Sequence, residues 1–426
     1  MDYLVKPKEN FSLEVTIPGS KSISNRALIL AALRGKKCIL RNFLLSDDTT
    51  YMIEGLKKLG NIIEFSENNN ELTVIGNNKR VFDNVSVYTG NAGTMMRFLS
   101  SYIATGFGTV TLSGNSRMNE RPIKDLVDSL EELGVKIQYL ENTGYPPISL
   151  SVNSNNFSDS VKVKGDKSSQ YLSSLLMAAP YFKNGLKIEL QSHLVSRPYI
   201  DMTLSMMSEF GVKVKEDKIE NCFYIPCGKY ELDNYLIEGD MSSASYFLAM
   251  ALITNSTIKI NNYFKNSIQG DKKFLEIFLN LGGRILNETP NSITVSGIEN
   301  YKGIDIDLND SPDIAQTLAV VALFAKTSTT VTNVANMRIK ETDRITALKN
   351  EILKLGGEFI EREDSFTIIP KTSYKGVTVE TYDDHRMAMS FSLAGLKIPG
   401  IIIKESNCVS KTFPDYFKIF NKIYEV

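Results

Sequence analysis

The chain has 426 residues, of which 42% are hydrophobic and 23% charged, and its formal net charge is −1. This length favours two domains of roughly 200 residues each. The balanced charge argues against a protein that binds nucleic acid or an acidic membrane through its overall charge. No apolar run approaches the ~20 residues of a membrane span. The first residues also lack the basic and apolar regions of a signal peptide, so we expect a cytoplasmic protein.

Six short β-rich runs each break at small or polar residues and lead into an apolar helix. These junctions recur about every seventy residues, at 18–33, 89–104, 164–179, 238–253, 309–324 and 382–396. The recurrence predicts six copies of one α/β unit. Helix N-termini carry free N–H groups and the positive end of the helix dipole, so each junction is also a candidate anion site.

A glycine follows Leu or Phe at the end of a second helix in five of the copies. These glycines, which we expect at left-handed C′ positions, are Gly60, Gly134, Gly211, Gly282 and Gly356. The alternating run behind each one predicts a β-hairpin. No hairpin can follow the helix predicted at 415–426, so residues 2–17 are expected to supply the sixth. Division into three and three predicts one lobe of 1–18 plus 239–426 and another of 19–238.

Lys21, Ser22 and Arg26 lie at the start of the first predicted helix, where a phosphate could meet a hydroxyl, a guanidinium and backbone N–H groups. A plain surface helix is the alternative. In GNAGT, Gly93 would let a ligand approach the backbone closely, although simple helix capping also explains the motif. Arg121, in a loop before the next helix, is either solvated or placed to close over a carboxylate or phosphate.

The later junctions carry both acids and bases. Lys340 and Arg344 are four residues apart, which predicts one helix face, and an anion between them would relieve their repulsion. Glu341 or Asp343 could be that anion. Asp313 is expected as a helix cap in a place with few positive groups. The fourth junction, EGDMSSAS at 238–245, has no cation and is predicted to serve as a hinge.

Taken in order, the motifs GNAGTxxR, RMxERP, SSQ, SRPY, EGDxSSAS, SPD, KETDR, DDHRMAM and KTFPDY resemble those of the 5-enolpyruvylshikimate-3-phosphate synthase family over essentially the whole chain. The resemblance implies a two-lobed inside-out α/β barrel of six βαβαββ repeats, three per lobe. It also implies transfer of the enolpyruvyl group of phosphoenolpyruvate to the 5-hydroxyl of shikimate 3-phosphate, in the shikimate pathway. A monomer without cofactor, metal, nucleic-acid or membrane partner is expected.

The same resemblance implies roles for individual residues. It assigns shikimate 3-phosphate to Lys21, Ser22, Arg26, Ser168, Ser169, Gln170, Ser196, Tyr199, Asp313, Asn336 and Lys340. It assigns phosphoenolpyruvate to Lys21, Gly93, Arg121, Gln170, Arg344, Arg386 and Lys411. It assigns catalysis to Asp313, Glu341, Lys21 and His385. Asp313 and Glu341 form the proton-transfer pair.

Two departures from the family pattern follow GNAGT, where many members have Ala and Pro and this chain has Met95 and Phe98. Gly93 itself is kept, so we expect glyphosate to compete with phosphoenolpyruvate. The related transferase acting on UDP-N-acetylglucosamine has a cysteine in its mobile loop, whereas the matching stretch 112–122 has none. A repeated ring or clamp protein that encircles DNA is a second alternative, which needs a broad positive face.

Overall fold

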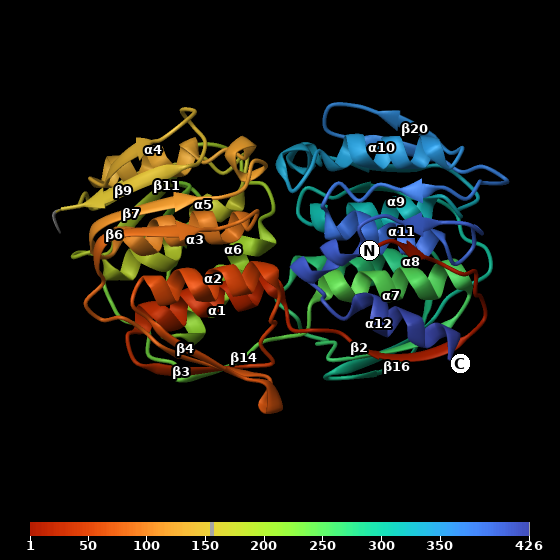
Figure 1. The fold of residues 1–426 in the computed structure, drawn as a ribbon, viewed down its shortest axis with the longest axis horizontal. Coiled ribbons are helices and arrows are strands. Elements are labelled where there is room, and N and C mark those ends of the chain that lie inside the picture. Colours follow the sequence, from red (N-terminus) through yellow and green to blue (C-terminus); the bar gives the residue numbers. More distant parts are fainter. Residues whose placement is uncertain (154–156, 426) are drawn as a thin grey trace. The chain divides into compact units, whose positions relative to one another are not determined.

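The computed structural model describes residues 1–153 and 157–425. The chain forms two compact units (Figure 1). Unit 1 consists of Met1–Gly19 and Glu238–Val426, and unit 2 consists of Ser20–Ile237. Within the described residues each unit contains three small β-sheets and six α-helices. No helix among these residues is long and apolar enough to cross a membrane.

Unit 2 carries its helices in three pairs, one pair with each sheet. The helices are α1 (Lys21–Arg34), α2 (Asp47–Lys58), α3 (Gly93–Ala104), α4 (Lys124–Leu133), α5 (Ser169–Ala178) and α6 (Pro198–Glu209). The sheets have the strand orders β14-β3-β5-β4, β6-β7-β9-β8 and β10-β11-β13-β12. The strands are β3 (Lys37–Arg41), β4 (Ile62–Ser66), β5 (Glu71–Ile75), β6 (Val81–Tyr88), β7 (Phe107–Ser113), β8 (Lys136–Tyr139), β9 (Ile148–Val152), β10 (Ser160–Val163), β11 (Leu186–Leu190), β12 (Lys215–Asp217), β13 (Cys222–Ile225) and β14 (Asn234–Leu236).

Unit 1 repeats this plan with one shorter sheet. Its helices are α7 (Met241–Thr254), α8 (Lys273–Asn280), α9 (Ala315–Ala322), α10 (Arg344–Lys354), α11 (His385–Ala394) and α12 (Tyr416–Phe420). The sheets have the orders β16-β17-β15-β2, β18-β19-β21-β20 and β1-β23-β22. The strands are β1 (Tyr3–Leu4), β2 (Ser12–Thr16), β15 (Thr257–Asn261), β16 (Arg284–Thr289), β17 (Ser292–Ser296), β18 (Asp305–Asp307), β19 (Thr329–Thr332), β20 (Glu358–Glu361), β21 (Phe366–Ile369), β22 (Thr378–Val379) and β23 (Ile402–Ile403).

One strand pattern recurs in the four-stranded sheets. In β6-β7-β9-β8, the strands β6 and β7 are parallel, and β9 is antiparallel to both β7 and β8. Helix α3 connects the parallel strands and α4 leads into the hairpin, which gives the order βαβαββ. The predicted α/β class and its repeating unit are therefore confirmed.

The helices that open the repeats form the centre of each unit. Every residue of α1 from Ile23 to Leu33 is buried, and so is every residue of α11. Helices α1, α3 and α5 pack on one another in unit 2, as α7, α9 and α11 do in unit 1. The sheets bury only alternate residues, such as Leu13 and Val15 in β2. Helices without a solvent face belong inside, so the sheets cover them with one face toward water.

The local signals read from the sequence mark real element ends. Helices α1, α3, α5, α7, α9 and α11 all begin within the six junctions. The five glycines after the second helices all have positive φ, from 86° at Gly60 to 109° at Gly134. The hairpins predicted behind them are β4/β5, β8/β9, β12/β13, β16/β17 and β20/β21.

The prediction that residues 2–17 form the sixth hairpin is wrong. Tyr3–Leu4 pairs antiparallel with β23, but Ser12–Thr16 pairs in parallel with β15 in another sheet. Strand β14 likewise pairs in parallel with β3. The two segments that lead from one unit to the other are linked by a bridge between Gly19 and Gly239. Strands β2 and β14 have thus exchanged sheets: β2 pairs with β15, which follows β14 in the chain, and β14 pairs with β3, which follows β2.

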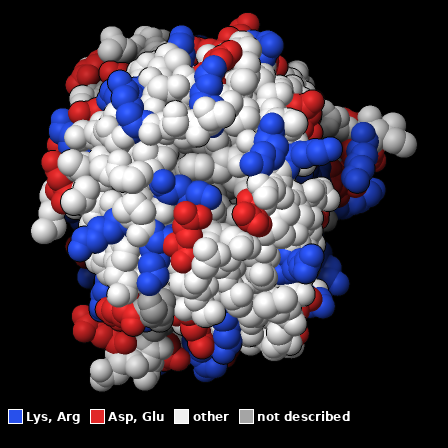
Figure 2. All heavy atoms as spheres, turned by 90° about the vertical axis from the view of Figure 1, so that its right-hand side faces the viewer, with Lys and Arg blue, Asp and Glu red and all other residues white. Residues whose placement is uncertain are grey.

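The C-terminal prediction needs a smaller correction. Residues 415–426 were expected to form one helix, but α12 ends at Phe420 and a 3-10 turn follows at Asn421–Tyr424. Val426 lies outside the described residues. On the face of the protein shown in Figure 2, basic and acidic side chains lie interspersed.

Candidate functional site

The start of α1 presents Lys21 and buries Arg26. Ser20 caps the helix by accepting a hydrogen bond from the Ile23 N–H, and the Nζ of Lys21 lies 3.2 Å from Oδ2 of Asp48. Asp48 was not expected at this site, because it belongs to the neighbouring helix α2. Lys21 is therefore held at the helix N-terminus by a carboxylate that the local motif does not contain.

Arg26 ties α1 to two other helices. Its guanidinium donates to Thr203 Oγ1 at 2.8 Å, Ser173 Oγ at 3.2 Å, the Tyr199 carbonyl at 3.3 Å and the Ser22 carbonyl at 3.1 Å. These bonds to described residues occupy four of its five N–H groups. Burial lowers its pKa to about 10. The alternative of a solvated surface helix is wrong, because Arg26 is 2% exposed.

Two arginines converge on Gly93 at the start of α3. Arg97 donates to the carbonyls of Gly93 at 3.1 Å and Pro122 at 2.8 Å. Arg121 donates to the backbone carbonyl of Asn91 at 3.0 Å and to its Oδ1 at 3.1 Å. A Cβ on Gly93 would lie 2.5 Å from Nη1 of Arg97 and 2.6 Å from Nη2 of Arg121. The absence of a side chain at Gly93 is thus what allows both guanidinium groups to lie there.

Arg121 is buried, so the solvated reading of this arginine is wrong. The helix that follows begins at Lys124, two residues after Pro122. Arg117 differs, because it pairs with the exposed Glu120 at 2.7 Å. Arg121 is therefore the loop arginine that the structure places at Gly93.

The start of α5 lies beside the start of α3. Ser168 caps α5 by accepting from the Gln170 N–H at 3.2 Å, and Gln170 Nε2 donates to Thr94 Oγ1 at 3.1 Å. Ser169 is buried. Ser196, also buried, has a φ of 55° in the loop before α6 and accepts from the Tyr199 N–H through its carbonyl at 3.1 Å. The Arg26 guanidinium lies 5.7 Å from the Tyr199 ring, so the predicted residues of unit 2 lie around four neighbouring helix starts.

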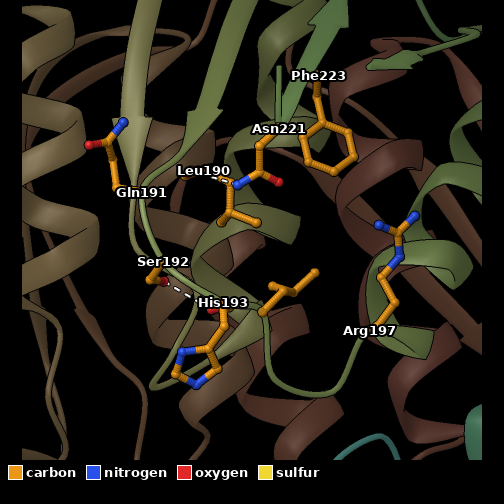
Figure 3. A pocket seen from close by; sticks show the side chains of 8 residues that line it. Leu190, Gln191, Ser192, His193, Arg197, Asn221 and Phe223 are labelled. Carbon is orange, nitrogen blue, oxygen red and sulfur yellow. Dashed lines mark hydrogen bonds between the residues drawn. The ribbon is translucent and has the colours of Figure 1, made fainter. Parts of the chain in front are cut away.

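A pocket of about 500 Å³ lies beside the loop that leads from β11 to α6 (Figure 3). Its lining residues come from β11, that loop and β13, and they are Leu190, Gln191, Ser192, His193, Leu194, Arg197, Asn221 and Phe223. Arg197 is paired with Glu216 at 2.6 and 2.7 Å and with Asp201 at 2.8 Å. These carboxylates neutralise its charge, and no predicted site residue lines the pocket, so we do not assign it to an anionic substrate.

Asp313, in the 3-10 turn Pro312–Ile314 before α9, lies among three cations of unit 1. Its Oδ1 lies 2.8 Å from Arg344 Nη1 and 3.6 Å from Lys340 Nζ, and its Oδ2 lies 3.3 Å from Arg386 Nη2. The expectation of few positive groups here is wrong. Burial acts to raise the pKa of Asp313, but the charges of Arg386, Lys340 and Arg344 together hold it well below its usual range.

Arg344 is the centre of this cluster and is 1% exposed. Besides Asp313, it pairs with Glu341 Oε2 at 2.8 Å and with Asp384 Oδ2 at 2.7 Å. Asp384 also caps α11 by accepting from the Arg386 N–H at 2.9 Å. No role for Asp384 was expected from the sequence. Its place directly before a helix, where Asp is a favoured cap, was the available signal.

Lys340 and Arg344 do not share a helix face, contrary to the prediction. Helix α10 begins at Arg344, and Lys340 follows the 3-10 turn Ala335–Ile339. Asp343 caps α10 and pairs with Arg338 at 3.0 Å. The two cations nevertheless lie close together, because both contact Asp313, which belongs to a different segment of the chain.

The remaining predicted residues of unit 1, His385, Lys411 and Asn336, are buried. His385 begins α11, and its Nδ1 lies 3.7 Å from Asp384 Oδ1. Lys411 ends the 3-10 segment Ser406–Lys411, which packs against α11. Asn336 lies in the turn before Lys340. Among residues 1–153 and 157–425, no group of three or more His, Cys, Asp or Glu could hold a metal ion.

The sequence and fold match one family of known proteins. The family model described as EPSP synthase (3-phosphoshikimate 1-carboxyvinyltransferase) matches residues 5–420. The 3-phosphoshikimate 1-carboxyvinyltransferase of Sulfurovum sp. (strain NBC37-1) is 44% identical over 423 residues, 98% of each chain. That of Shewanella pealeana is 43% identical with the same coverage. The solved EPSP synthase from Acinetobacter baumannii matches with a TM-score of 0.80 and 25% identity, covering 99% of this chain and 98% of that one.

Proposed function

Because the chain belongs to the EPSP synthase family, we propose that it transfers the enolpyruvyl group of phosphoenolpyruvate to the 5-hydroxyl of shikimate 3-phosphate and releases phosphate. The observation that carries the proposal beyond family membership is the Asp313 cluster, where one carboxylate, 14% exposed, meets Arg344, Lys340 and Arg386. Such a set can bind anions and hold an ionised carboxylate next to them.

The reaction needs a base and an acid. The 5-hydroxyl attacks C2 of phosphoenolpyruvate while C3 is protonated, which gives a tetrahedral ketal phosphate. This intermediate then loses a proton from C3 and expels phosphate. We assign the base near the hydroxyl to Asp313 and the acid near C3 to Glu341, whose protonation is helped or shared by Lys21 or Lys340. His385 stays beside this pair as a proposed contributor.

The low pKa of Asp313 fits a base that becomes active only when the substrates bind. Without substrate, the three cations make its carboxylate a weak proton acceptor. Phosphoenolpyruvate and shikimate 3-phosphate each bring a carboxylate and a phosphate, and each phosphate carries about −1.5 to −2 charges at neutral pH. This negative charge offsets the field of the cations and raises the pKa of Asp313 toward the working pH.

The clustered cations also serve the binding of two mutually repelling reactants. In unit 2 the candidates are Lys21 and Arg121, and in unit 1 they are Arg344, Arg386 and Lys411. Positive groups fixed before the reaction orient the anions and stabilise charge that develops in the transition state. The proposal includes the substrate assignments made from the family resemblance and the two lobes with these roles. It also includes a monomeric, cytoplasmic enzyme without cofactor.

Two alternatives are less favoured. The UDP-N-acetylglucosamine enolpyruvyl transferase has a cysteine in its mobile loop, and the matching stretch of this chain, 112–122, has none. A DNA clamp needs a continuous basic surface, whereas basic and acidic groups are interspersed on the face in Figure 2.

Release of inorganic phosphate tests the function. The purified protein should release phosphate from phosphoenolpyruvate only when shikimate 3-phosphate is added, and one enolpyruvyl product should form per phosphate. UDP-N-acetylglucosamine in place of shikimate 3-phosphate is the control and should give none. Phosphate release from phosphoenolpyruvate with the UDP-sugar, but not with shikimate 3-phosphate, would refute the proposal.

A further inference from the structure

Ser242 joins Arg386 to a buried carboxylate that belongs to no assigned role. It is the second residue of α7, and its Oγ accepts a hydrogen bond from Arg386 Nη2 at 3.4 Å. The same hydroxyl donates to Oδ2 of Asp271, in the 3-10 turn Gly270–Lys272. Arg386 Nη1 donates in turn to the Asp313 carbonyl at 3.0 Å. A chain of polar contacts therefore runs from Asp271 through Ser242 and Arg386 to Asp313.

The turn that carries Asp271 is fixed against the starts of two other repeats. Gln269 donates to the Gly239 carbonyl at 2.8 Å and accepts from the Met241 N–H at 3.2 Å, at the beginning of α7. Ser311, just before Asp313, donates to the Gly270 carbonyl at 3.1 Å. Asp271 thus has little freedom to move, which suits a residue that orients others.

The direction of these hydrogen bonds explains the arrangement. A serine hydroxyl has one proton and two lone pairs. Giving the proton to Asp271 leaves only lone pairs for Arg386, so Ser242 presents an acceptor to the guanidinium. We infer that Ser242 and Asp271 are positioning residues that hold Arg386 in the orientation that binds the anionic end of phosphoenolpyruvate. This inference rests on the proposed function.

The protonation state of Asp271 decides whether the arrangement holds. Asp271 is 4% exposed and is faced by Asp240 at the cap of α7, Asp313 and Arg386. Burial and then Asp313 raise its pKa to about 6, against the opposing effect of Arg386. Once protonated, Asp271 can donate to Ser242, whose proton then turns toward the guanidinium. Lowering the pH through 6 should therefore weaken the hold on Arg386.

Steady-state kinetics of phosphate release between pH 5.5 and 8.5 test this inference. At pH 8, Ser242→Ala should raise KM for phosphoenolpyruvate about tenfold, the value of one hydrogen bond to a charged group. The kcat and the KM for shikimate 3-phosphate should stay within about twofold of the wild-type values. The reason is that the lost contact holds phosphoenolpyruvate equally in the ground state and the transition state. Ser242→Thr keeps the hydroxyl and should restore KM. Asp310→Asn, which removes an exposed carboxylate of the same unit, is the matched control.

The pH profile of Asp271→Asn separates positioning from a general loss of structure. Its KM should exceed that of the wild type at pH 8, and the ratio should approach one below pH 6, where the wild type is also protonated. The double variant Ser242→Ala/Asp271→Asn should resemble either single variant, because both substitutions interrupt the same chain of contacts to Arg386. A ratio that is constant with pH, or a loss confined to kcat, overturns the inference. A wild type that releases no phosphate instead overturns the proposed function, and the inference with it.

Discussion

Replacing Asp271 by asparagine should stabilise the folded protein at neutral pH. The pKa of this buried carboxyl rises from 3.8 to about 6, and one pKa unit corresponds to about 1.4 kcal/mol. Between these two values the unfolded chain loses its proton before the folded protein does, so stability falls as the pH rises. The raised pKa of Asp271 lowers the unfolding free energy of the wild type by about 1 kcal/mol at pH 4.5 and by about 3 kcal/mol at pH 8. Asparagine has nearly the same shape and carries no such cost.

Hydrogen exchange in increasing urea, read on peptides of unit 1, measures this gain. Separate readings are needed because two compact units need not unfold in one transition. Asp271→Asn should exceed the wild type in unfolding free energy by an amount that grows by about 2 kcal/mol from pH 4.5 to pH 8. Asp310→Asn should show no such growth. A gain that is equal at both pH values, or a loss at pH 8, would refute the reasoning.

Other predictions concern the residues of the proposed site. Asp313→Ala and Glu341→Ala should each lower kcat by about 10² to 10⁴, and a normal rate in either variant removes that residue from the proton-transfer pair. Gly93→Ala should raise KM for phosphoenolpyruvate roughly tenfold because its Cβ must displace Arg97 and Arg121; an unchanged KM would show that neither guanidinium matters there. In the wild type, millimolar glyphosate should inhibit competitively with phosphoenolpyruvate, and turnover that it leaves unaffected contradicts this expectation.

Local chemistry explains which parts of the fold were predictable. Ser20 and Ser168 cap their helices through side-chain hydrogen bonds a few residues away, and Gly60 ends a helix because it takes a positive φ. Both signals are complete within a short stretch of chain. The exchange of β2 and β14 could not be read in this way, because Leu13 and Val15 would alternate equally well beside any parallel partner.

The same distinction applies to the site. Lys340 and Arg344 were singled out from the sequence, and Glu341, one of the two anions suggested for them, does pair with Arg344. The helix face that they were predicted to share was wrong. Their partner Asp313 comes from a distant segment, and no spacing rule reports that contact. Asp271 was missed altogether, since an aspartate in a polar turn resembles any solvated acid until packing buries it.

The strand exchange also makes unit 2 an insertion within unit 1. The bridge between Gly19 and Gly239 holds the two ends of Ser20–Ile237 next to each other, as in proteins that tolerate a whole domain in one loop. All strands of the three unit 2 sheets lie inside that uninterrupted stretch. During synthesis, unit 2 can therefore fold as soon as it is complete, whereas β2 must wait for β15 to emerge. Strand β1 is made before β2 and waits longer still, because its partner β23 lies at Ile402–Ile403.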